Sequence, residues 1–451
     1  MGTGILSFLR PLIGWIYINS LYFGGYAIAV ASIFKKAEWG LMLLVALIPL
    51  PTLWYPLYNF SMGGDLLNVL FLSIMWGIIF NKKGYTLSGN SIAIMLFIIM
   101  SYLSLWICSI NYSLPLPITT DNPVIKIWKN YVFMIFTYFF AFNAIKDEKW
   151  QKRLILVMSL VVLFIAIKSL RNFTAGSSFA DESRDAGPFW IVFLNSNHFG
   201  AFIAYCFSFF LGLSLLEKDK KRKLLYLATA ASCLHPLFFS YSRGAYLAAF
   251  SVVMVYGILK HRRLLIAGVL VLVLWQVVLP SSVVERIQMT ETDTGALESS
   301  AAVRLNLWNN AINMFEQYPL FGSGFKGFTL AYKEERWSDT HNFYLKTLAE
   351  QGIIGVSLLA IILLAAIRSG WRLFKAGNTP FQKGLGYGFL GCVIAHIVTN
   401  MFGDRWSYYE MGSYFWIFWG IVDRGILITK ASKGQAKQVA NVVPAVGKSN
   451  A

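Results

Sequence analysis

The sequence is poor in charged residues, and this shortage excludes the commonest class of protein. Only 14% of its 451 residues are charged, whereas soluble domains carry about a quarter. Hydrophobic residues make up 57% of the chain, and its mean hydropathy is +0.57. We therefore do not expect a soluble globular protein.

Cysteine is also scarce, and its positions argue against disulfides and zinc. The four cysteines, Cys108, Cys206, Cys233 and Cys392, all fall inside apolar segments, and no Cys-x-x-Cys pair occurs. Such pairs mark most structural zinc sites. We interpret the four residues as small hydrophobic side chains.

Several catalytic motifs are missing as well. The chain has no Walker A loop, no paired aspartates on a long loop and no Gly-x-Ser-x-Gly turn. These absences count against nucleotide-driven transport and serine-hydrolase chemistry. A metal-dependent transferase is disfavoured but stays open, because the scattered carboxylates Asp293, Asp339 and Asp404 remain. We expect no bound metal and no cofactor.

What the chain has instead is a series of apolar stretches, each close to the ~20 residues that cross a membrane as a helix. They predict an all-α polytopic membrane protein with about twelve or thirteen transmembrane helices. The higher count places spans at 12–34, 39–58, 66–81, 91–110, 128–145, 154–170, 198–216, 224–241, 245–259, 264–280, 352–367, 385–402 and 408–427. Pro49, Pro51, Pro56 and the pair Gly63-Gly64 favour one broken or re-entrant helix between 39 and 80 as the alternative.

The net charge of +17 follows a membrane pattern and not a nucleic-acid pattern. Nucleic-acid binders gather positive charge on a folded surface or in a basic arm. Here the basic clusters lie in loops between spans, as in cytoplasmic loops of membrane proteins. They fall at 146–153, 218–223, 260–263, 368–383 and beyond 430. We predict a membrane protein with a cytoplasmic C-terminus, membrane lipids as partners and no nucleic acid; in a bacterial inner membrane the opposite side is the periplasm.

The spans divide the chain into four regions. We expect an N-terminal transmembrane bundle at 1–280, a periplasmic loop at 281–351, further transmembrane helices at 352–427 and a disordered basic tail at 428–451. Helical spacing predicts an amphipathic helix in the loop, with apolar residues at Ala302, Leu305, Trp308, Ile312 and Phe315. Tyr318-Pro319 should end this helix, and a second one should run from about Thr340 into the next span.

Four arginines lie on the side that the positive-inside rule leaves poor in cations: Arg184, Arg243, Arg304 and Arg405. A charge beside a membrane is costly and needs an explanation. Each alone is explained by snorkelling to lipid headgroups or by pairing with a neighbouring carboxylate. As a set they suit a diphosphate substrate, because guanidinium groups bind phosphate bidentately and stay charged.

One histidine has the position of a catalytic residue. Of the five histidines, only His341 lies in the long periplasmic loop, at the start of a predicted helix. Histidine titrates near neutral pH, so His341 can act as a general base or can orient a hydroxyl group. The structural alternative is a local hydrogen bond at the helix start.

The order of several short motifs resembles the bacterial O-antigen ligases and their relatives, the O-antigen and exopolysaccharide polymerases. The resemblance is clearest from about Leu194 to Gly420. It is carried by NSNHFG at 195–200, SYSRGAY at 240–246, Arg304 with Trp308, YPLFGSG at 318–324, and HNFYL at 341–345 followed by Glu350, Gly352 and Gly355. Each motif alone is weak, and their order and common side make the combination specific.

The resemblance implies a fold and an activity. Family members are metal-independent transferases of GT-C-like fold that take glycan from an undecaprenyl diphosphate carrier. By position, Arg184 and Arg243 would bind the carrier diphosphate, and His341 would activate the acceptor hydroxyl. Arg304 and Arg405 would assist in diphosphate or glycan binding. Four aromatic residues would stack on sugars, or anchor the loop at the membrane interface: Trp308, Tyr332, Trp337 and Tyr344.

The acceptor is left open by these motifs. A ligase would transfer the glycan to lipid A-core, which we favour, and a polymerase would transfer it to another carrier-linked glycan. The run NMFGDRW at 400–406 resembles the exopolysaccharide polymerases and keeps that alternative close. A transporter or flippase would show inverted repeats and charges near the membrane midplane, and we find no clear repeat and few such charges. A scaffold role is the remaining alternative.

Overall fold

The structure is a computed structural model that describes residues 2–34, 36–80, 85–172, 184–288, 299–333 and 339–446. Within these ranges the chain is helical and contains no strand, so the predicted all-α class is confirmed. The first half comprises α1 (Gly2–Phe34), α2 (Ala37–Leu47), α3 (Pro51–Trp54), η1 (Tyr55–Asn59), η2 (Gly63–Asp65), α4 (Leu66–Ile79), α5 (Ser91–Asn111), α6 (Ile125–Ala144), α7 (Glu148–Asn172) and η3 (Gly187–Val192). The second half comprises α8 (Ser196–Leu216), α9 (Lys220–Ser232), α10 (Leu234–Phe239), α11 (Arg243–Leu259), α12 (Arg262–Val273), α13 (Trp275–Val278), α14 (Ser281–Gln288), α15 (Ser299–Gln317), α16 (Gly327–Ala331), α17 (Phe343–Ala376), α18 (Pro380–Asn400) and α19 (Tyr409–Val446).

Several of these helices are long and apolar enough to cross a membrane. Five meet that standard within the described residues: α1 from Gly14, α5, α7, α8 and α17. The pair formed by α2 and the segment Pro51–Asn59 is bent by 102° and makes a sixth, broken candidate. A break near Pro49 and Pro51 is therefore present, but it lies within 37–59, and α4 is a separate helix. The protein is a multi-pass membrane protein, and the total of twelve or thirteen crossings stays a prediction.

The centre of the bundle is built on close contact between α8 and α18. A Cβ atom on Gly212 of α8 would lie 2.6 Å from the Cα of Gly388 on α18, so neither position leaves room for a side chain. Lipid tails are as apolar as leucine, and packing of small residues therefore drives helix association inside a membrane. α17 packs on α18, and α6 packs on α19, to complete the bundle.

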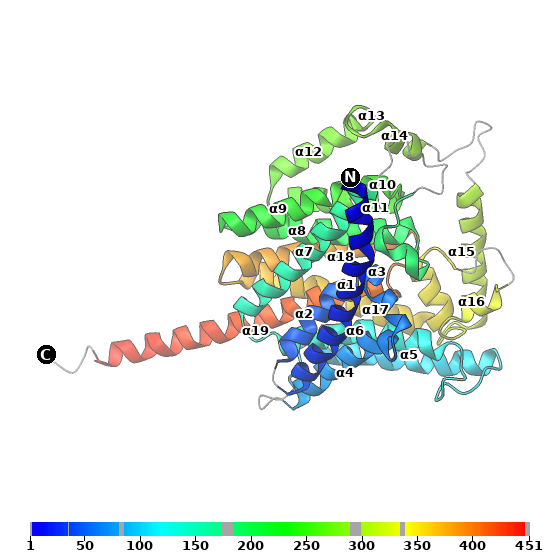
Figure 1. The fold of residues 1–451 in the computed structure, drawn as a ribbon, viewed down its shortest axis with the longest axis horizontal. Coiled ribbons are helices and arrows are strands. Elements are labelled where there is room, and N and C mark those ends of the chain that lie inside the picture. The colour runs from blue at the N-terminus through cyan, green and yellow to red at the C-terminus, as the bar shows by residue number, and fades with distance from the viewer. Residues whose placement is uncertain are drawn as a thin grey trace.

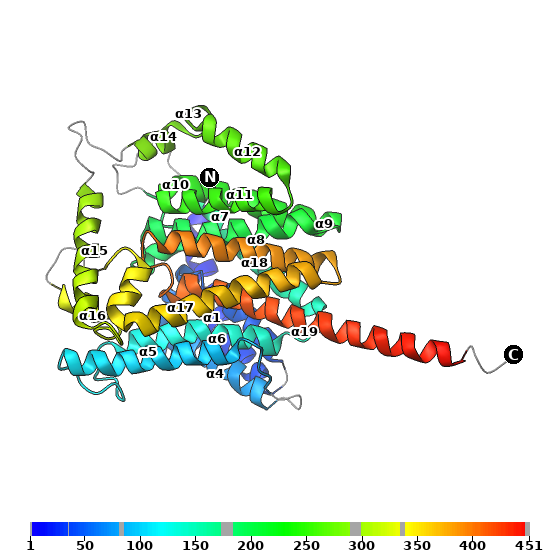
Figure 2. The same ribbon diagram turned by 180° about the vertical axis from the view of Figure 1, so that it is seen from behind.

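The two ends of the bundle carry different structures. α15 lies crosswise at one end, next to the start of α17, while α19 projects from the other (Figure 1, Figure 2). We call these the α15 end and the α19 end. The amphipathic helix expected between 301 and 315 is α15, and the second helix expected from about Thr340 is the first part of α17.

The packed face of α15 differs from the expected one. Leu307, Ala311 and Met314 form a small core with residues of α16 and α17, whereas Leu305 and Ile312 are 47% and 41% exposed. Both sets of residues recur at helical spacing, and spacing alone does not say which of two adjacent faces meets the partner.

The C-terminal tail also differs from the expectation. We expected a disordered tail at 428–451, but α19 continues to Val446. Extending an existing helix needs no new nucleus, and the alanine, lysine and glutamine residues of the tail favour helix. α19 therefore carries the basic tail outward as a continuation (Figure 1).

Candidate active site

A break in α17 anchors the loop that follows α15. At Gly352 the backbone has φ +63°, which splits α17 into a short first helix and the long span. A Cβ atom there would lie 2.4 Å from the carbonyl oxygen of Leu320. Four backbone hydrogen bonds close the junction: from Ile353 to Pro319 (2.9 Å), from Ile354 to Leu320 (3.3 Å), from Ser323 to Ala349 (2.9 Å) and from Gly324 to Glu350 (2.9 Å). The YPLFGSG run thus fixes the end of α15 against α17 through backbone hydrogen bonds.

His341 lies in the turn directly before α17. Its backbone is in the left-handed region, with φ +51°. Asn342 caps the helix, since its side-chain oxygen accepts the N–H groups of Tyr344 and Leu345. On the other flank, the indole N–H of Trp308 on α15 donates to the carbonyl of Thr340 over 3.1 Å. Two helices therefore fix the backbone turn that carries His341.

The loop between α18 and α19 is tied to the same helix start by an ion pair. Nζ of Lys346 on α17 lies 2.8 Å from Oδ2 of Asp404, which is fully buried. The other carboxylate oxygen of Asp404 accepts the backbone N–H groups of Trp406 and Ser407. Burial alone would raise the pKa of Asp404, but Lys346 and Lys326 hold it well below its usual range. Asp404 is therefore an anion that shapes this loop.

Arg405 follows that aspartate and is 5% exposed. Its backbone N–H donates to Oδ1 of Asn400 (2.9 Å), and its Nη1 lies 3.4 Å from the carbonyl of Asp404. No carboxylate of the described residues lies within 4.0 Å of the guanidinium. Burial lowers the pKa of Arg405 from its ordinary value, which Tyr408 and Asp339 partly offset. The structure thus keeps a cation buried without a carboxylate beside it.

Arg184 is held at the junction of α8 and α11. Its guanidinium donates to the carbonyls of Ser240 (2.9 Å) and Tyr241 (3.2 Å), and to Oδ1 of Asn197 (3.0 Å). Burial lowers its pKa most, and the nearby cations Arg243, Arg405 and Arg304 lower it further, against Tyr246. The other three predicted arginines therefore lie close enough to act electrostatically on Arg184.

Arg243 opens α11, one residue before a close contact with the Arg405 loop. A Cβ atom on Gly244 would lie 3.2 Å from the side chain of Phe402. Arg304 sits on α15 one turn before Trp308, and it acts on both Arg184 and His341. The structure brings together Arg184, Arg243, Arg304, Arg405 and His341, and their roles stay predictions.

The environment of His341 favours the neutral imidazole. Burial lowers its pKa most, Arg304, Arg405 and Lys346 lower it further, and Asp339 acts in the opposite direction. A neutral imidazole is the form that accepts a proton. The surroundings therefore suit a general base at neutral pH.

Two carboxylates at the α15 end lie beside the ammonium group of Lys346. Asp404 and Asp339 lie 2.8 and 3.7 Å from Nζ of Lys346. Within the described ranges, no group of three or more histidine, cysteine, aspartate or glutamate side chains gathers as a metal site would need. The chemistry that the arrangement offers is anion binding beside a base.

The predicted aromatic residues have diverse positions. The Trp308 indole N–H is engaged by the turn before His341, and the Tyr344 hydroxyl donates to the carbonyl of Ile397 in α18 over 2.9 Å. The ring of Tyr332 packs against Phe328 with centroids 4.8 Å apart. Trp337 lies outside the described residues. Stacking on sugars stays a prediction for all four.

Sequence reasoning missed three residues at this end. Arg286 on α14 is 7% exposed, and its Nε lies 3.5 Å from the Tyr241 carbonyl that also binds Arg184. Lys346 is a charge at the entrance of a span, which was a usable signal. His198 is 7% exposed, packs edge-on against Tyr408, and its buried Nε2 has no hydrogen-bond partner in the described part of the chain. Its place in the NSNHFG motif was the available hint.

Comparison with known families identifies the segment that carries much of this site. Residues 227–360 match the family model described as O-antigen ligase. These residues are thus similar to the O-antigen ligase family, and we call them the O-antigen ligase segment. It contains Arg243, Arg304 and His341, while Arg184 and Arg405 lie outside it. No curated protein sequence matches the chain.

The O-antigen ligase segment confirms the resemblance that the motifs suggested. It supports a membrane glycosyltransferase of the O-antigen ligase or polymerase type. In general, such an enzyme transfers a lipid-linked glycan to a glycan or lipid acceptor.

Proposed function

We propose that the protein transfers a glycan from an undecaprenyl diphosphate carrier to a hydroxyl of lipid A-core on the periplasmic side of the inner membrane. The convergence of Arg184, Arg243, Arg304 and Arg405 supports this proposal most strongly. Gathering four guanidinium groups costs electrostatic repulsion, and a bound diphosphate relieves it. Three helices, α8, α11 and α17, also begin here, and helix N-termini favour anions.

In the proposed reaction, the acceptor hydroxyl attacks the anomeric carbon of the carrier-linked sugar. His341 takes the proton of that hydroxyl as the new C–O bond forms. The bond between the anomeric carbon and the carrier diphosphate breaks, and the diphosphate leaves with the electron pair. Attack from the face opposite the leaving group inverts the anomeric configuration.

The arginines supply the charge stabilisation for the leaving group. A fixed, buried cation such as Arg405 costs no reorganisation when charge develops on the diphosphate. We therefore propose a metal-independent transfer. Activity should persist in EDTA, and a strict need for added magnesium or manganese would contradict the proposal.

A polymerase is the second candidate, because the Arg405 loop has the NMFGDRW sequence that resembles exopolysaccharide polymerases. Both candidates share the donor and differ in the acceptor. Purified protein in proteoliposomes should be given carrier-linked glycan with and without lipid A-core. Product that requires lipid A-core supports the ligase, and chain growth from carrier-linked glycan alone supports the polymerase.

A further inference from the structure

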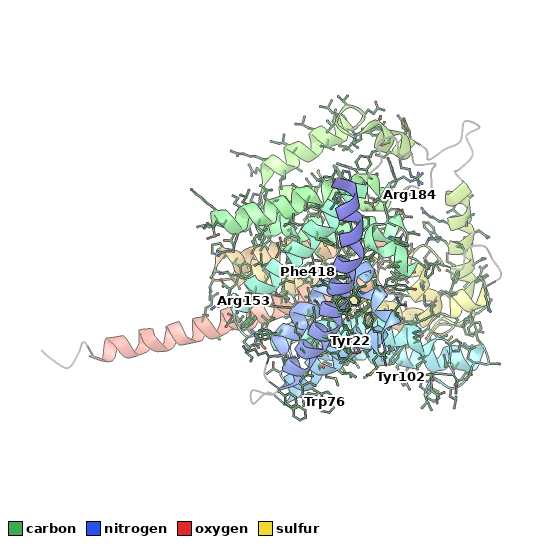
Figure 3. The ribbon with its side chains drawn as sticks, viewed as in Figure 1. Tyr22, Trp76, Tyr102, Arg153, Arg184 and Phe418 are labelled. Atoms are coloured by element: carbon green, nitrogen blue, oxygen red, sulfur yellow. The ribbon has the colours of Figure 1, made fainter. Side chains whose placement is uncertain are left out.

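A second group of cations lies at the other end of α7 from the candidate active site. Near the C-terminal end of α7, the hydroxyl of Ser169 donates to Asp185, next to Arg184. Lys149 lies in its first turn, 20 residues earlier, which is roughly 30 Å along a helix. Figure 3 labels Arg184 toward the α15 end and Arg153 near the α19 end.

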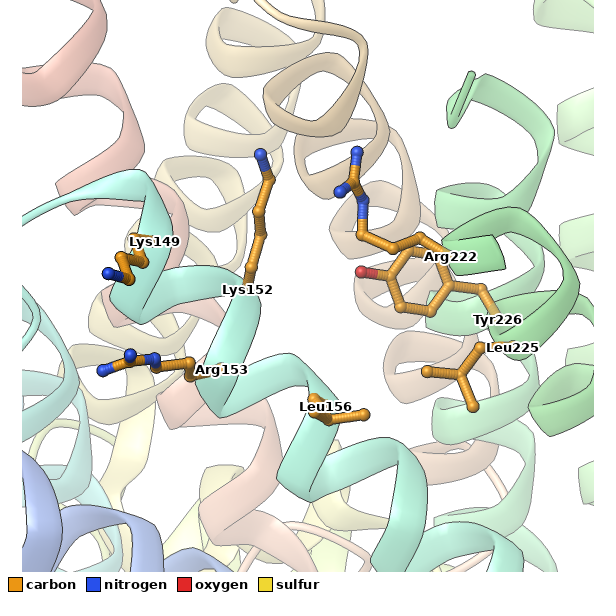
Figure 4. A pocket seen from close by; sticks show the side chains of 7 residues that line it. All are labelled: Lys149, Lys152, Arg153, Leu156, Arg222, Leu225 and Tyr226. Carbon is orange, nitrogen blue, oxygen red and sulfur yellow. The ribbon is translucent and has the colours of Figure 1, made fainter. Parts of the chain in front are cut away.

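These cations line a pocket of about 390 Å³ between α7 and α9. Lys149, Lys152 and Arg153 come from α7 and Arg222 comes from α9, while Leu156 and Leu225 face each other in the apolar part (Figure 4). Just beyond, the hydroxyls of Ser159 and Thr229 meet at 2.5 Å and join the two helices. Lys152 and Arg222 extend beside the gap between the two helices, and the charged ends of Lys149 and Arg153 lie on the outer side of α7 (Figure 4).

The pocket retains a positive excess after its internal ion pairs are counted. Lys152 pairs with Glu148 at 2.5 Å, and Arg222 pairs with Glu217 at 3.1 Å. In the described part of the chain, no carboxylate lies within 4.0 Å of the Lys149 or Arg153 side chain. Neither cation is therefore neutralised by a carboxylate there, and the Arg153 guanidinium lies over the ring of Trp150, 4.5 Å from its centroid.

An apolar row continues from the pocket along the outer surface of α7. Leu156, Leu160 and Phe164 are 42%, 54% and 46% exposed, and their spacing of four residues puts them on one face. This row runs away from the cations toward the middle of the bundle. Its direction fits a hydrocarbon chain whose polar head lies at Lys149 and Arg153.

We propose that an anionic phospholipid binds beside this pocket on the outer face of α7, with the headgroup phosphate at Lys149 and Arg153 and an acyl chain along Leu156, Leu160 and Phe164. Basic pockets between membrane helices are suited to anionic headgroups. The apolar row distinguishes a lipid from free phosphate, since a free anion would gain nothing from it. The site does not depend on the glycan-transfer function.

The test measures lipid binding to the full-length purified protein in detergent. The thermal unfolding midpoint, followed by tryptophan fluorescence, is titrated with phosphatidylglycerol, phosphatidylcholine or inorganic phosphate. Phosphatidylglycerol should raise the midpoint of the wild type, and phosphatidylcholine and phosphate should not. The double variant Lys149→Gln/Arg153→Gln should bind phosphatidylglycerol roughly 30-fold more weakly, because each basic residue contributes about one kcal/mol near an anionic lipid surface.

A matched control removes two cations outside the pocket. Arg262→Gln/Arg263→Gln, at the start of α12, should keep the wild-type response. Equal weakening in this control would reduce the site to general surface charge and overturn the proposal. So would unchanged binding in the pocket variant, or a midpoint shift from phosphate as large as that from the lipid. Because the substituted side chains are exposed, the single variants Lys149→Gln and Arg153→Gln provide folded versions if the double variant is unstable.

Discussion

Both ends of α7 lie beside clusters of positive charge, but the two clusters are built differently. At the α15 end, Arg405 is buried, and Arg184 donates hydrogen bonds to backbone carbonyls between α10 and α11. At the α19 end, Lys149 and Arg153 are exposed, and the paired cations meet acids close in sequence. Burial and long-range support fix the first cluster in one geometry. Exposed side chains leave the second adaptable, which suits a lipid headgroup more than a reacting group.

The largest expected effect comes from His341, since the pocket between α7 and α9 has no histidine among its lining residues. His341→Ala should reduce glycan transfer by roughly 10²- to 10⁴-fold, the range of a general base. Binding of the carrier-linked glycan should persist through the arginines. Transfer rates and donor binding, measured on the same purified variant, check both statements. Near wild-type transfer would remove His341 from the site, and near wild-type transfer by His341→Gln would leave it only an orienting role.

The next effect separates the two clusters directly. Arg405→Ala should lower transfer by roughly 10²- to 10³-fold, because the variant loses a preorganised charge at the leaving group. Arg405→Lys should restore only part of the rate, since an ammonium lacks the bidentate fork. Arg153→Ala, at the other end of α7, is the matched control and should transfer normally. Equal losses in Arg153→Ala and Arg405→Ala would mean that the two clusters do not differ in function.

Stability provides a third comparison, between a buried and an exposed ion pair. Lys346→Met leaves Asp404 as an uncompensated buried charge and should cost about 3–5 kcal/mol of unfolding free energy. Lys152→Met breaks the partly exposed pair with Glu148 and should cost at most about 1 kcal/mol. Denaturant unfolding in detergent measures both values. Similar losses would show that the Lys346–Asp404 pair is no more critical to the fold than a surface pair.

The smallest expected effect is a shift of the pH profile. Because burial and nearby cations lower the pKa of His341, its neutral form should persist below pH 6.5. Transfer should stay constant from pH 8 to pH 6.5 and fall at lower pH, as the base becomes protonated. Arg304→Gln removes one of these cations and should move the falling limb to higher pH. A limb that stays in place would argue that another group sets the profile.

Particular residues show how far sequence reasoning reached. The positive-inside rule selected Arg184, Arg243, Arg304 and Arg405 without any contact information, and the structure gathers them at one end. Arg286 and His198 were missed. Arg286 lies on the short helix α14 without a distinctive pattern, and His198 was noted only as part of the NSNHFG motif. The prediction of which face of α15 is buried was also wrong, because apolar residues recur with the same period on two adjacent faces.

The sequence by itself determined that the protein is a helical, multi-pass membrane protein, because composition and apolar run length decide whether a chain can lie in lipid. It also determined which residue types were available for anion chemistry. Only the tertiary structure decided that Lys346 neutralises Asp404, that Trp308 binds the turn before His341, and that the YPLFGSG run joins α15 to α17. Those contacts join residues from separate helices, and no local pattern encodes which helix ends will meet.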